Sequence, residues 1–242
     1  MKRALLVDTA EIEAIRHMMT TDAISGVTTN PSLISKEKNT SYIGHLREIV
    51  EIIEDSPTTL SGERKHLSVE VTSLDCDKMI EESRVLAQNL SSPRINLFVK
   101  IPVSINNLSV ITELTKMGIS VNATACMTYT QAKLSADAGA KIVSFFFNRM
   151  FDMEKCPKTQ MTRDLALQNI SKFSTLERYS RDRWTPQVIC GSIRSTTDVI
   201  DCWTNGADYV TASPKIIVDL CRHPATDQAI DEFTRAFEEW RR

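Results

Sequence analysis

The sequence predicts an α/β fold, namely a single (β/α)8 barrel with an additional C-terminal helix. The chain has 242 residues, which is an ordinary length for one α/β barrel. Eight short apolar segments alternate along it with longer segments of helical periodicity. The apolar segments are continuous rather than alternating, which is typical of parallel strands that are covered on both faces. Eight such strands separated by helices favour a closed parallel barrel.

Each predicted strand is a short apolar run. In chain order, the predicted strands are residues 4–8, 26–30, 67–71, 97–103, 120–125, 141–147, 187–192 and 209–212.

The predicted helices between the strands are recognised by their ends. Gly or Asn directly after the last periodic residue is a usual helix stop. Three helices end in this way: 110–117 before Gly118, 130–138 before Gly139, and 196–204 before Asn205.

We expect residues 1–242 to form one domain, because no repeat, low-complexity segment or clear linker interrupts the pattern. The best predicted loop is 55–65, which is polar and contains both Pro57 and Gly62. Residues 156–183 are charged and predicted to be mostly helical.

The C-terminal segment 225–242 is predicted to be an extra amphipathic helix. Ile230, Phe233, Phe237 and Trp240 recur at a spacing of three or four residues and form one apolar face. Two interpretations fit this periodicity. The face packs on its own barrel, which we favour, or it packs on a neighbouring subunit.

Composition and charge argue against several functional classes. The formal net charge of −2 gives no preference for nucleic acid or for an anionic membrane surface. No apolar run approaches the ~20 residues that span a bilayer. The first apolar run, residues 4–8, is too short for a signal peptide. We therefore expect a cytoplasmic protein that binds neither nucleic acid nor membrane.

Cysteines and histidines show no pattern of metal or disulfide chemistry. The six cysteines are scattered, without a C-x-x-C pair, and are expected to be reduced. The four histidines lack metal-ligand spacing, so no metal is expected. His45 and His66 are interpreted as surface or satisfied core residues rather than catalysts.

Lys100 is the candidate nucleophile, because it interrupts the apolar strand 97–103. Burial disfavours a charged amine and lowers its pKa. A neutral lysine forms imines with carbonyl substrates. Such an enzyme makes or breaks carbon–carbon bonds without a metal or another cofactor.

Polar side chains at other strand ends are candidates for the same site. Active sites of such barrels are built at the C-terminal ends of the strands. A single buried carboxylate is often structural, but an Asp, a Glu and a Lys in apolar strands need partners, so we expect them to share one cavity. The candidates are Asp8, Thr28, Asn30, Glu70, Lys100, Asn122, Thr124, Ser144, Phe146, Arg149, Ser192 and Arg194.

Three of these residues are suited to proton transfer. Asp8 is placed to take the proton from a substrate hydroxyl as the carbon–carbon bond breaks. Glu70 and Thr124 could hold a water that exchanges protons during imine formation and hydrolysis.

The other side chains are suited to binding a sugar phosphate. Asn30 and Asn122 can hydrogen-bond sugar hydroxyls. Arg149 and Arg194, with Ser192, are suited to a phosphate, because a guanidinium group matches its oxygens bidentately. Taken alone, each arginine is more often part of a surface salt bridge.

Seven short motifs run from the first predicted strand to the last and cover nearly the whole chain. They are V-D-T at 7–9, G-V-T-T-N-P-S-L-I at 26–34, F-V-K-I-P at 98–102, N-A-T at 122–124, N-R at 148–149, G-S-I-R at 191–194 and S-P-K at 213–215. Together they resemble the transaldolases. The T-T-N-P-S and V-K-I-P runs are specific in combination.

The resemblance implies a (β/α)8 barrel with a Schiff-base lysine on the fourth strand, here Lys100. It implies that Asp8 is the acid and base at the bond being broken, and that Glu70 and Thr124 hold the catalytic water. The sugar-phosphate site would be lined by Thr28, Asn30, Asn122, Ser144, Arg149, Ser192 and Arg194.

One branch of this family, the fructose 6-phosphate aldolases, has Gln at the position of Glu70 and Tyr at that of Phe146. This chain has the transaldolase pattern at both positions. Its short length resembles the compact group that forms pentamers and decamers through a C-terminal helix, whereas S-P-K resembles longer, dimeric members. We therefore expect a homo-oligomer: a dimer, a pentamer or a decamer.

The expected function is transfer of a dihydroxyacetone unit from fructose 6-phosphate or sedoheptulose 7-phosphate to an aldose phosphate. Three alternatives stay open: a fructose 6-phosphate aldolase-like lyase, a specialised biosynthetic transaldolase, and a non-catalytic protein that binds sugar phosphates.

Overall fold

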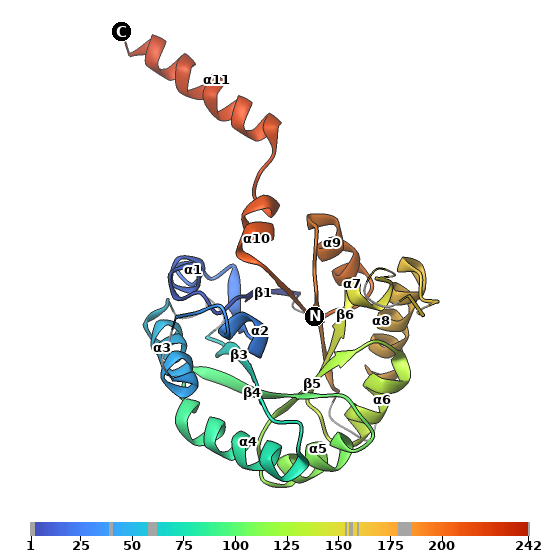
Figure 1. Ribbon diagram of the computed structural model, residues 1–242. Helices are drawn as coiled ribbons and strands as arrows, with labels where there is room; N and C mark the ends of the chain where they lie inside the picture. Colours follow the sequence, from blue (N-terminus) through green and yellow to red (C-terminus); the bar gives the residue numbers. More distant parts are fainter. Residues whose placement is uncertain are drawn as a thin grey trace.

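The computed structural model describes residues 3–38, 41–57, 62–152, 154, 157–158, 160–178 and 185–241. Eight parallel strands form a closed barrel in chain order, from β1 to β8 and back to β1, and helices surround it (Figure 1). Strands and helices alternate along the chain. The predicted (β/α)8 barrel is confirmed.

The strands lie close to their predicted positions. They are β1 (Ala4–Asp8), β2 (Ile24–Thr28), β3 (Lys65–Glu70), β4 (Ile95–Pro102), β5 (Val121–Cys126), β6 (Ile142–Phe146), β7 (Gln187–Gly191) and β8 (Tyr209–Ala212). β1 and β8 have the predicted bounds. β2 ends before Asn30 because that residue caps the next helix, accepting a hydrogen bond from the Leu33 N–H at 3.0 Å, and Pro31 fits the first helical turn.

Helices lie between the strands, as the alternating pattern predicted. They are α1 (Ile12–Met18), α2 (Pro31–Ile34), α3 (Tyr42–Asp55), α4 (Cys76–Leu90), α5 (Asn107–Lys116), α6 (Tyr129–Asp137), α7 (Phe147–Met150), α8 (Arg163–Arg178), α9 (Thr196–Thr204), α10 (Pro214–Leu220) and α11 (Pro224–Trp240). α9 has the predicted bounds. In the described part of the chain, none of the helices has the length and apolar character that crossing a bilayer requires.

Two predicted segments lie partly outside the residues that the structure describes. The predicted loop 55–65 lies between the end of α3 and the start of β3. Its middle, residues 58–61, lies outside the described residues. Of the segment 156–183, predicted to be mostly helical, residues 156, 159 and 179–183 also lie outside them, and α8 (Arg163–Arg178) confirms that the rest is mostly helical.

Below the site, an apolar cluster covers part of the inner face of the barrel. Leu6, Ile142 and Ile189 form a small cluster that packs with Phe98 and Tyr209. Side chains two positions apart on a strand point to the same face. The polar residues that follow at the strand ends therefore lie over an apolar floor.

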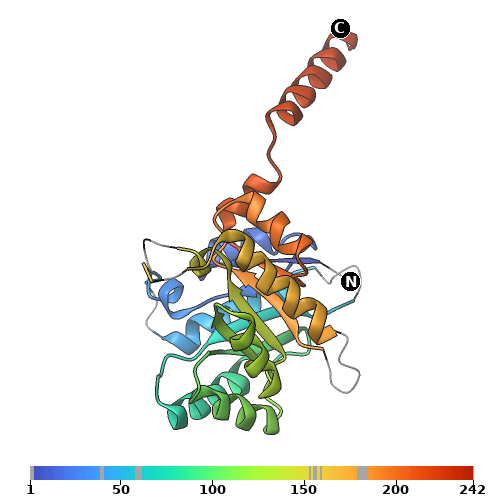
Figure 2. The ribbon, with the colours of Figure 1, turned by 90° about the vertical axis from the view of Figure 1, so that its right-hand side faces the viewer.

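The C-terminal helix α11 projects away from the barrel in both views (Figures 1 and 2). Its apolar face is open, with Phe233 72% and Trp240 78% exposed. The favoured prediction, that this face packs on its own barrel, is therefore wrong. The chain leaves α10 at Leu220 and restarts at Pro224 with His223 as the N-cap, so α11 takes a new direction. Packing on a neighbouring subunit stays a prediction.

Candidate active site

Side chains from the C-terminal ends of the strands converge on one cavity of about 100 Å³. Ten of the twelve predicted site residues line it: Asp8, Thr28, Asn30, Lys100, Asn122, Thr124, Ser144, Phe146, Arg149 and Ser192. Ile189, Gly191 and Thr211 complete the lining. Glu70 and Arg194 do not line it.

Lys100 is buried and has two polar partners. Its Nζ atom is 2.9 Å from Oε2 of Glu70 and donates a hydrogen bond to the Thr29 carbonyl at 2.8 Å. The pairing of β3 with β4 sets Glu70 directly beside Lys100. Buried charges need such partners, because removing one leaves the other uncompensated. Glu70 thus contacts the amine itself instead of lining the cavity.

Asp8 is held by a chain of two threonine hydroxyls. Thr28 Oγ1 donates to Asp8 Oδ1 at 2.7 Å and lies 2.5 Å from Oγ1 of Thr211. Burial raises the pKa of Asp8, and the nearby charge of Lys100 and the Thr28 hydrogen bond only partly offset this rise. A carboxyl group that keeps its proton to higher pH is suited to proton exchange with a substrate hydroxyl.

Thr124 lies at an irregularity of β5. The pairing of β5 with β6 shifts between Ala123 and Cys126, and Ala125 has a left-handed φ of 60°. Bulges of this kind re-aim side chains next to active sites. The Thr124 hydroxyl is buried and has no hydrogen-bond partner among the described residues. Groups of this kind usually bind a water or a ligand, so the water-holding role of Thr124 stays a prediction.

A chain of hydrogen bonds leads from the cavity into the barrel interior. Ser144 Oγ donates to Oδ1 of Asn122 at 2.7 Å, and the Asn122 amide donates to Ser68 Oγ at 3.1 Å. Ser68 Oγ in turn lies 2.7 Å from Nε2 of His66. Because Ser68 accepts from Asn122, its own proton is free to point at His66. The chain fixes the orientation of the Asn122 amide at the cavity.

His66 ends this chain among aromatic rings. It stacks on Phe98, with ring centroids 4.8 Å apart, and lies 5.4 Å from Tyr209. Burial, aided by the charge of Lys100, lowers the pKa of His66 to about 3, so the ring is neutral. The sequence left open whether His66 is a surface or a core histidine; it lies in the core, and its link to Asn122 was not predicted.

The two arginines differ in their partners. Arg149 lines the cavity, with its guanidinium carbon 5.5 Å from the centroid of the Phe146 ring. Arg194 instead forms an ion pair with the buried carboxylate of Asp152. Ser192, in a left-handed conformation with φ 58°, contributes to the cavity lining at the end of β7.

A sequence model described as "Transaldolase/Fructose-6-phosphate aldolase" matches residues 5–242. The chain belongs to this family. It is therefore an enzyme of the aldolase and transaldolase type.

Relatives of similar length match over nearly the whole chain. A probable transaldolase of Clostridium tetani (strain Massachusetts / E88) is 32% identical over 232 residues, which are 96% of each chain. A probable transaldolase of Desulforapulum autotrophicum is 35% identical over 228 residues, which are 94% of each chain. Among solved structures, one described as "Native KDPGal structure" covers 88% of this chain and 82% of its own, with a TM-score of 0.54 and 13% identity. That likeness shows the fold alone.

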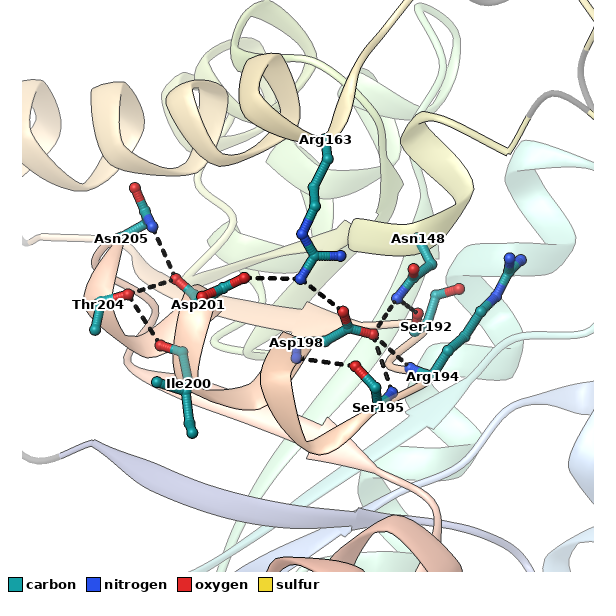
Figure 3. Close-up of polar contacts among 10 residues, drawn as sticks. All are labelled: Asn148, Arg163, Ser192, Arg194, Ser195, Asp198, Ile200, Asp201, Thr204 and Asn205. Atoms are coloured by element: carbon teal, nitrogen blue, oxygen red, sulfur yellow. Dashed lines mark hydrogen bonds and ion pairs between the residues drawn. The ribbon is translucent and has the colours of Figure 1, made fainter.

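In this member of the transaldolase/aldolase family, sequence reasoning missed Asp198, a buried carboxylate behind the site (Figure 3). Asp198 accepts hydrogen bonds from the Asn148 amide and from the backbone N–H groups of Arg194 and Ser195, and it pairs with Arg163. Burial acts to raise the pKa of Asp198, but these hydrogen bonds outweigh it and lower the pKa. The S-x-x-D spacing from Ser195 signals a helix cap. It does not signal the link to Asn148.

Proposed function

We propose that the protein is a transaldolase, which moves a dihydroxyacetone unit from a ketose phosphate to an aldose phosphate through an imine on Lys100. One observation carries the proposal. The amine of Lys100 lies in the same cavity as the carboxyl of Asp8, and Glu70 contacts that amine at 2.9 Å.

The first step joins Lys100 to the C2 ketone of a donor such as fructose 6-phosphate or sedoheptulose 7-phosphate. Glu70 is placed to take a proton from the ammonium group, which frees the nitrogen lone pair for attack. The carbonyl oxygen leaves as water when the iminium forms. The hydroxyl of Thr124, which has no hydrogen-bond partner within the described part of the chain, is suited to hold that water and to return it in the final hydrolysis.

The second step breaks the C3–C4 bond. Asp8 takes the proton of the C4 hydroxyl, the C4 oxygen becomes the carbonyl of the departing aldose phosphate, and the bonding electrons pass into the iminium. The product is an enamine on Lys100. An acceptor aldehyde then accepts the C3 carbon, and Asp8 returns the proton to the new hydroxyl.

The rest of the lining suits a sugar phosphate. Asn30, Asn122 and Ser144 offer hydrogen bonds to sugar hydroxyls. Arg149 offers a cation for the phosphate. Phe146 offers no proton to the enamine, which favours transfer to an acceptor over release of free dihydroxyacetone.

The substitution Lys100→Met tests the nucleophile, because it keeps an unbranched apolar side chain and removes the amine. We expect transfer to fall below about one thousandth of the wild-type rate. Borohydride, which reduces the imine, should leave a three-carbon adduct on Lys100 of the wild type. The variant should give no such adduct, as measured by mass spectrometry.

Two controls accompany this variant. Lys116→Met removes an exposed lysine and should keep full activity. Lys100→Met combined with Glu70→Gln removes the unpaired buried charge, so a folded but inactive double variant separates loss of chemistry from loss of stability. Wild-type turnover by Lys100→Met would exclude the mechanism. Release of free dihydroxyacetone without an acceptor would instead favour the aldolase alternative.

A further inference from the structure

We propose that Asp198 is the positioning residue of the subsite that takes the phosphate of the sugar. This inference rests on the function proposed above and deepens it, because it assigns a task to a carboxylate that lies outside the cavity lining.

Asp198 joins the ends of two neighbouring strands (Figure 3). Its Oδ2 accepts a hydrogen bond at 2.7 Å from Asn148, which follows β6. The same oxygen accepts from the backbone N–H groups of Arg194 at 2.9 Å and Ser195 at 3.0 Å, which follow β7. Asn148 also donates to the carbonyl of Ser192 at 2.9 Å. A helix cap needs only the bond to Ser195, so the other bonds serve to fix the two strand ends together.

These strand ends carry the groups that can hold an anion. Arg149 directly follows Asn148, and both Arg149 and Ser192 line the cavity. Ser192 has a left-handed φ of 58°, a conformation that is strained for a non-glycine residue and persists only where the surroundings impose it. The bond from Asn148 holds the carbonyl of Ser192, and the bond to Asp198 holds the backbone two residues later. Asp198 thus fixes the backbone that presents Ser192 beside Arg149.

The negative charge of Asp198 is partly offset by an ion pair with Arg163, which limits its repulsion of a phosphate. Oδ1 of Asp198 lies 2.8 Å from the guanidinium of Arg163, which also packs over the ring of Phe147 at 4.9 Å. Asp201, one turn further along α9, pairs with the same guanidinium at 2.7 Å. Among the described residues, Asp201 makes no hydrogen bond or ion pair with the strand ends, and it lies on the other side of the Arg163 guanidinium from Asn148 (Figure 3).

The substitution Asp198→Asn tests the inference. The amide has the same shape, but its NH2 group meets either Arg163 or the backbone N–H groups, so at least one set of bonds is lost. Transfer is measured with glyceraldehyde 3-phosphate and with unphosphorylated glyceraldehyde as acceptors. We expect KM for the phosphorylated acceptor to rise about tenfold. The kcat/KM for glyceraldehyde should change less than about twofold.

Asp201→Asn is the matched control, because it removes a carboxylate from the same arginine and the same helix. The KM and kcat/KM values of this variant for both acceptors should equal those of the wild type. If Asp198→Asn does not fold, Asn148→Leu removes the link between the strand ends without touching the helix cap, and the same split between acceptors is expected.

A similar loss for both acceptors, or no loss, would overturn the inference, since Asp198 would then be structural only. A second measurement separates this from failure of the proposed function. If the wild type transfers to neither acceptor, the function fails, and calorimetric titration with inorganic phosphate decides the role of Asp198. Weaker phosphate binding by Asp198→Asn than by the wild type supports it. Equal binding, or none in either protein, overturns it.

Discussion

Phe146 presents a ring without a hydroxyl to the cavity, next to the guanidinium of Arg149. At this position a phenol could deliver a proton to the enamine on Lys100, after which hydrolysis releases the three-carbon unit. We expect Phe146→Tyr to raise the release of free dihydroxyacetone at least about tenfold, because general acids typically contribute more than that.

Release from fructose 6-phosphate is measured without an acceptor, by coupling free dihydroxyacetone to a reductase. Phe146→Leu is the control, since it changes the ring but adds no proton donor. Equal release by the Tyr and Leu variants would show that the space at position 146, and not a proton donor, controls the release of free dihydroxyacetone.

The buried ring of His66 predicts how stability depends on pH. Its folded pKa of about 3 lies below the ordinary value of about 6.5. Between these values the unfolded chain binds one more proton than the folded chain, so the free energy of unfolding falls as the pH is lowered. The slope from this group is at most about 1.4 kcal/mol per pH unit.

His66→Gln should remove this contribution, which can be measured by denaturant unfolding between pH 7 and pH 4. His17→Gln replaces an exposed histidine and should keep the wild-type pH dependence. If His66→Gln shows the wild-type slope, another group causes the acid sensitivity.

The candidate catalytic residues were predictable where a charged side chain lies in an apolar strand. Asp8 and Lys100 stood out because a charge in an apolar run needs a partner. Thr211 and His66 did not stand out, because a hydroxyl or a neutral ring in a strand is common and its meaning depends on the neighbours. Thr211 acts through Thr28, and His66 acts on Asn122 through Ser68. The Thr28–Thr211 and Ser68–Asn122 bonds both join different strands.

Among the helices, α11 leads to the clearest testable prediction. Its exposed face includes Phe233, Phe237 and Trp240, and burying each such side chain contributes roughly 1.5–3 kcal/mol. We propose that this face packs on a second copy of the chain. Phe233→Asp combined with Phe237→Asp should reduce the mass measured by light scattering to that of a monomer.

The barrel of this variant should stay folded, because α11 projects away from it. Gln228→Asp adds one negative charge, half of that in the double variant, to the helix away from these rings and should keep the assembly. A wild-type protein that is already monomeric at micromolar concentration would contradict the prediction.

Helical periodicity predicted α11 but did not show which surface its apolar face contacts. An apolar stripe looks the same whether it faces the chain's own barrel or a neighbour. The deciding feature is the break between Leu220 and Pro224, which sets the direction of the helix. The end of β2 was misplaced for a related reason, since Asn30 looked like the last strand residue and is in fact a helix cap.

At the scale of the whole molecule, the barrel followed from the alternation of strands and helices, and the site followed from the rule that strand ends meet at one face. Contacts between distant segments were not predictable. Arg194 pairs with Asp152, 42 residues earlier, and Asp198 binds Asn148, 50 residues earlier. No local pattern records such partners, so one sequence alone showed which residues are polar at the site but not which of them neutralise each other.

The hydrogen bond between Thr28 and Thr211 joins residues that are 183 positions apart. It ties the support of Asp8 to the last strand, and it exists only after β8 closes the ring beside β1. During synthesis, a growing chain that has reached Lys100 and Asp8 still lacks this support until β8 has left the ribosome. Contacts of such high sequence separation form late in folding. The support of Asp8 through Thr28 and Thr211 therefore depends on closure of the whole barrel, and a chain that lacks β8 lacks it.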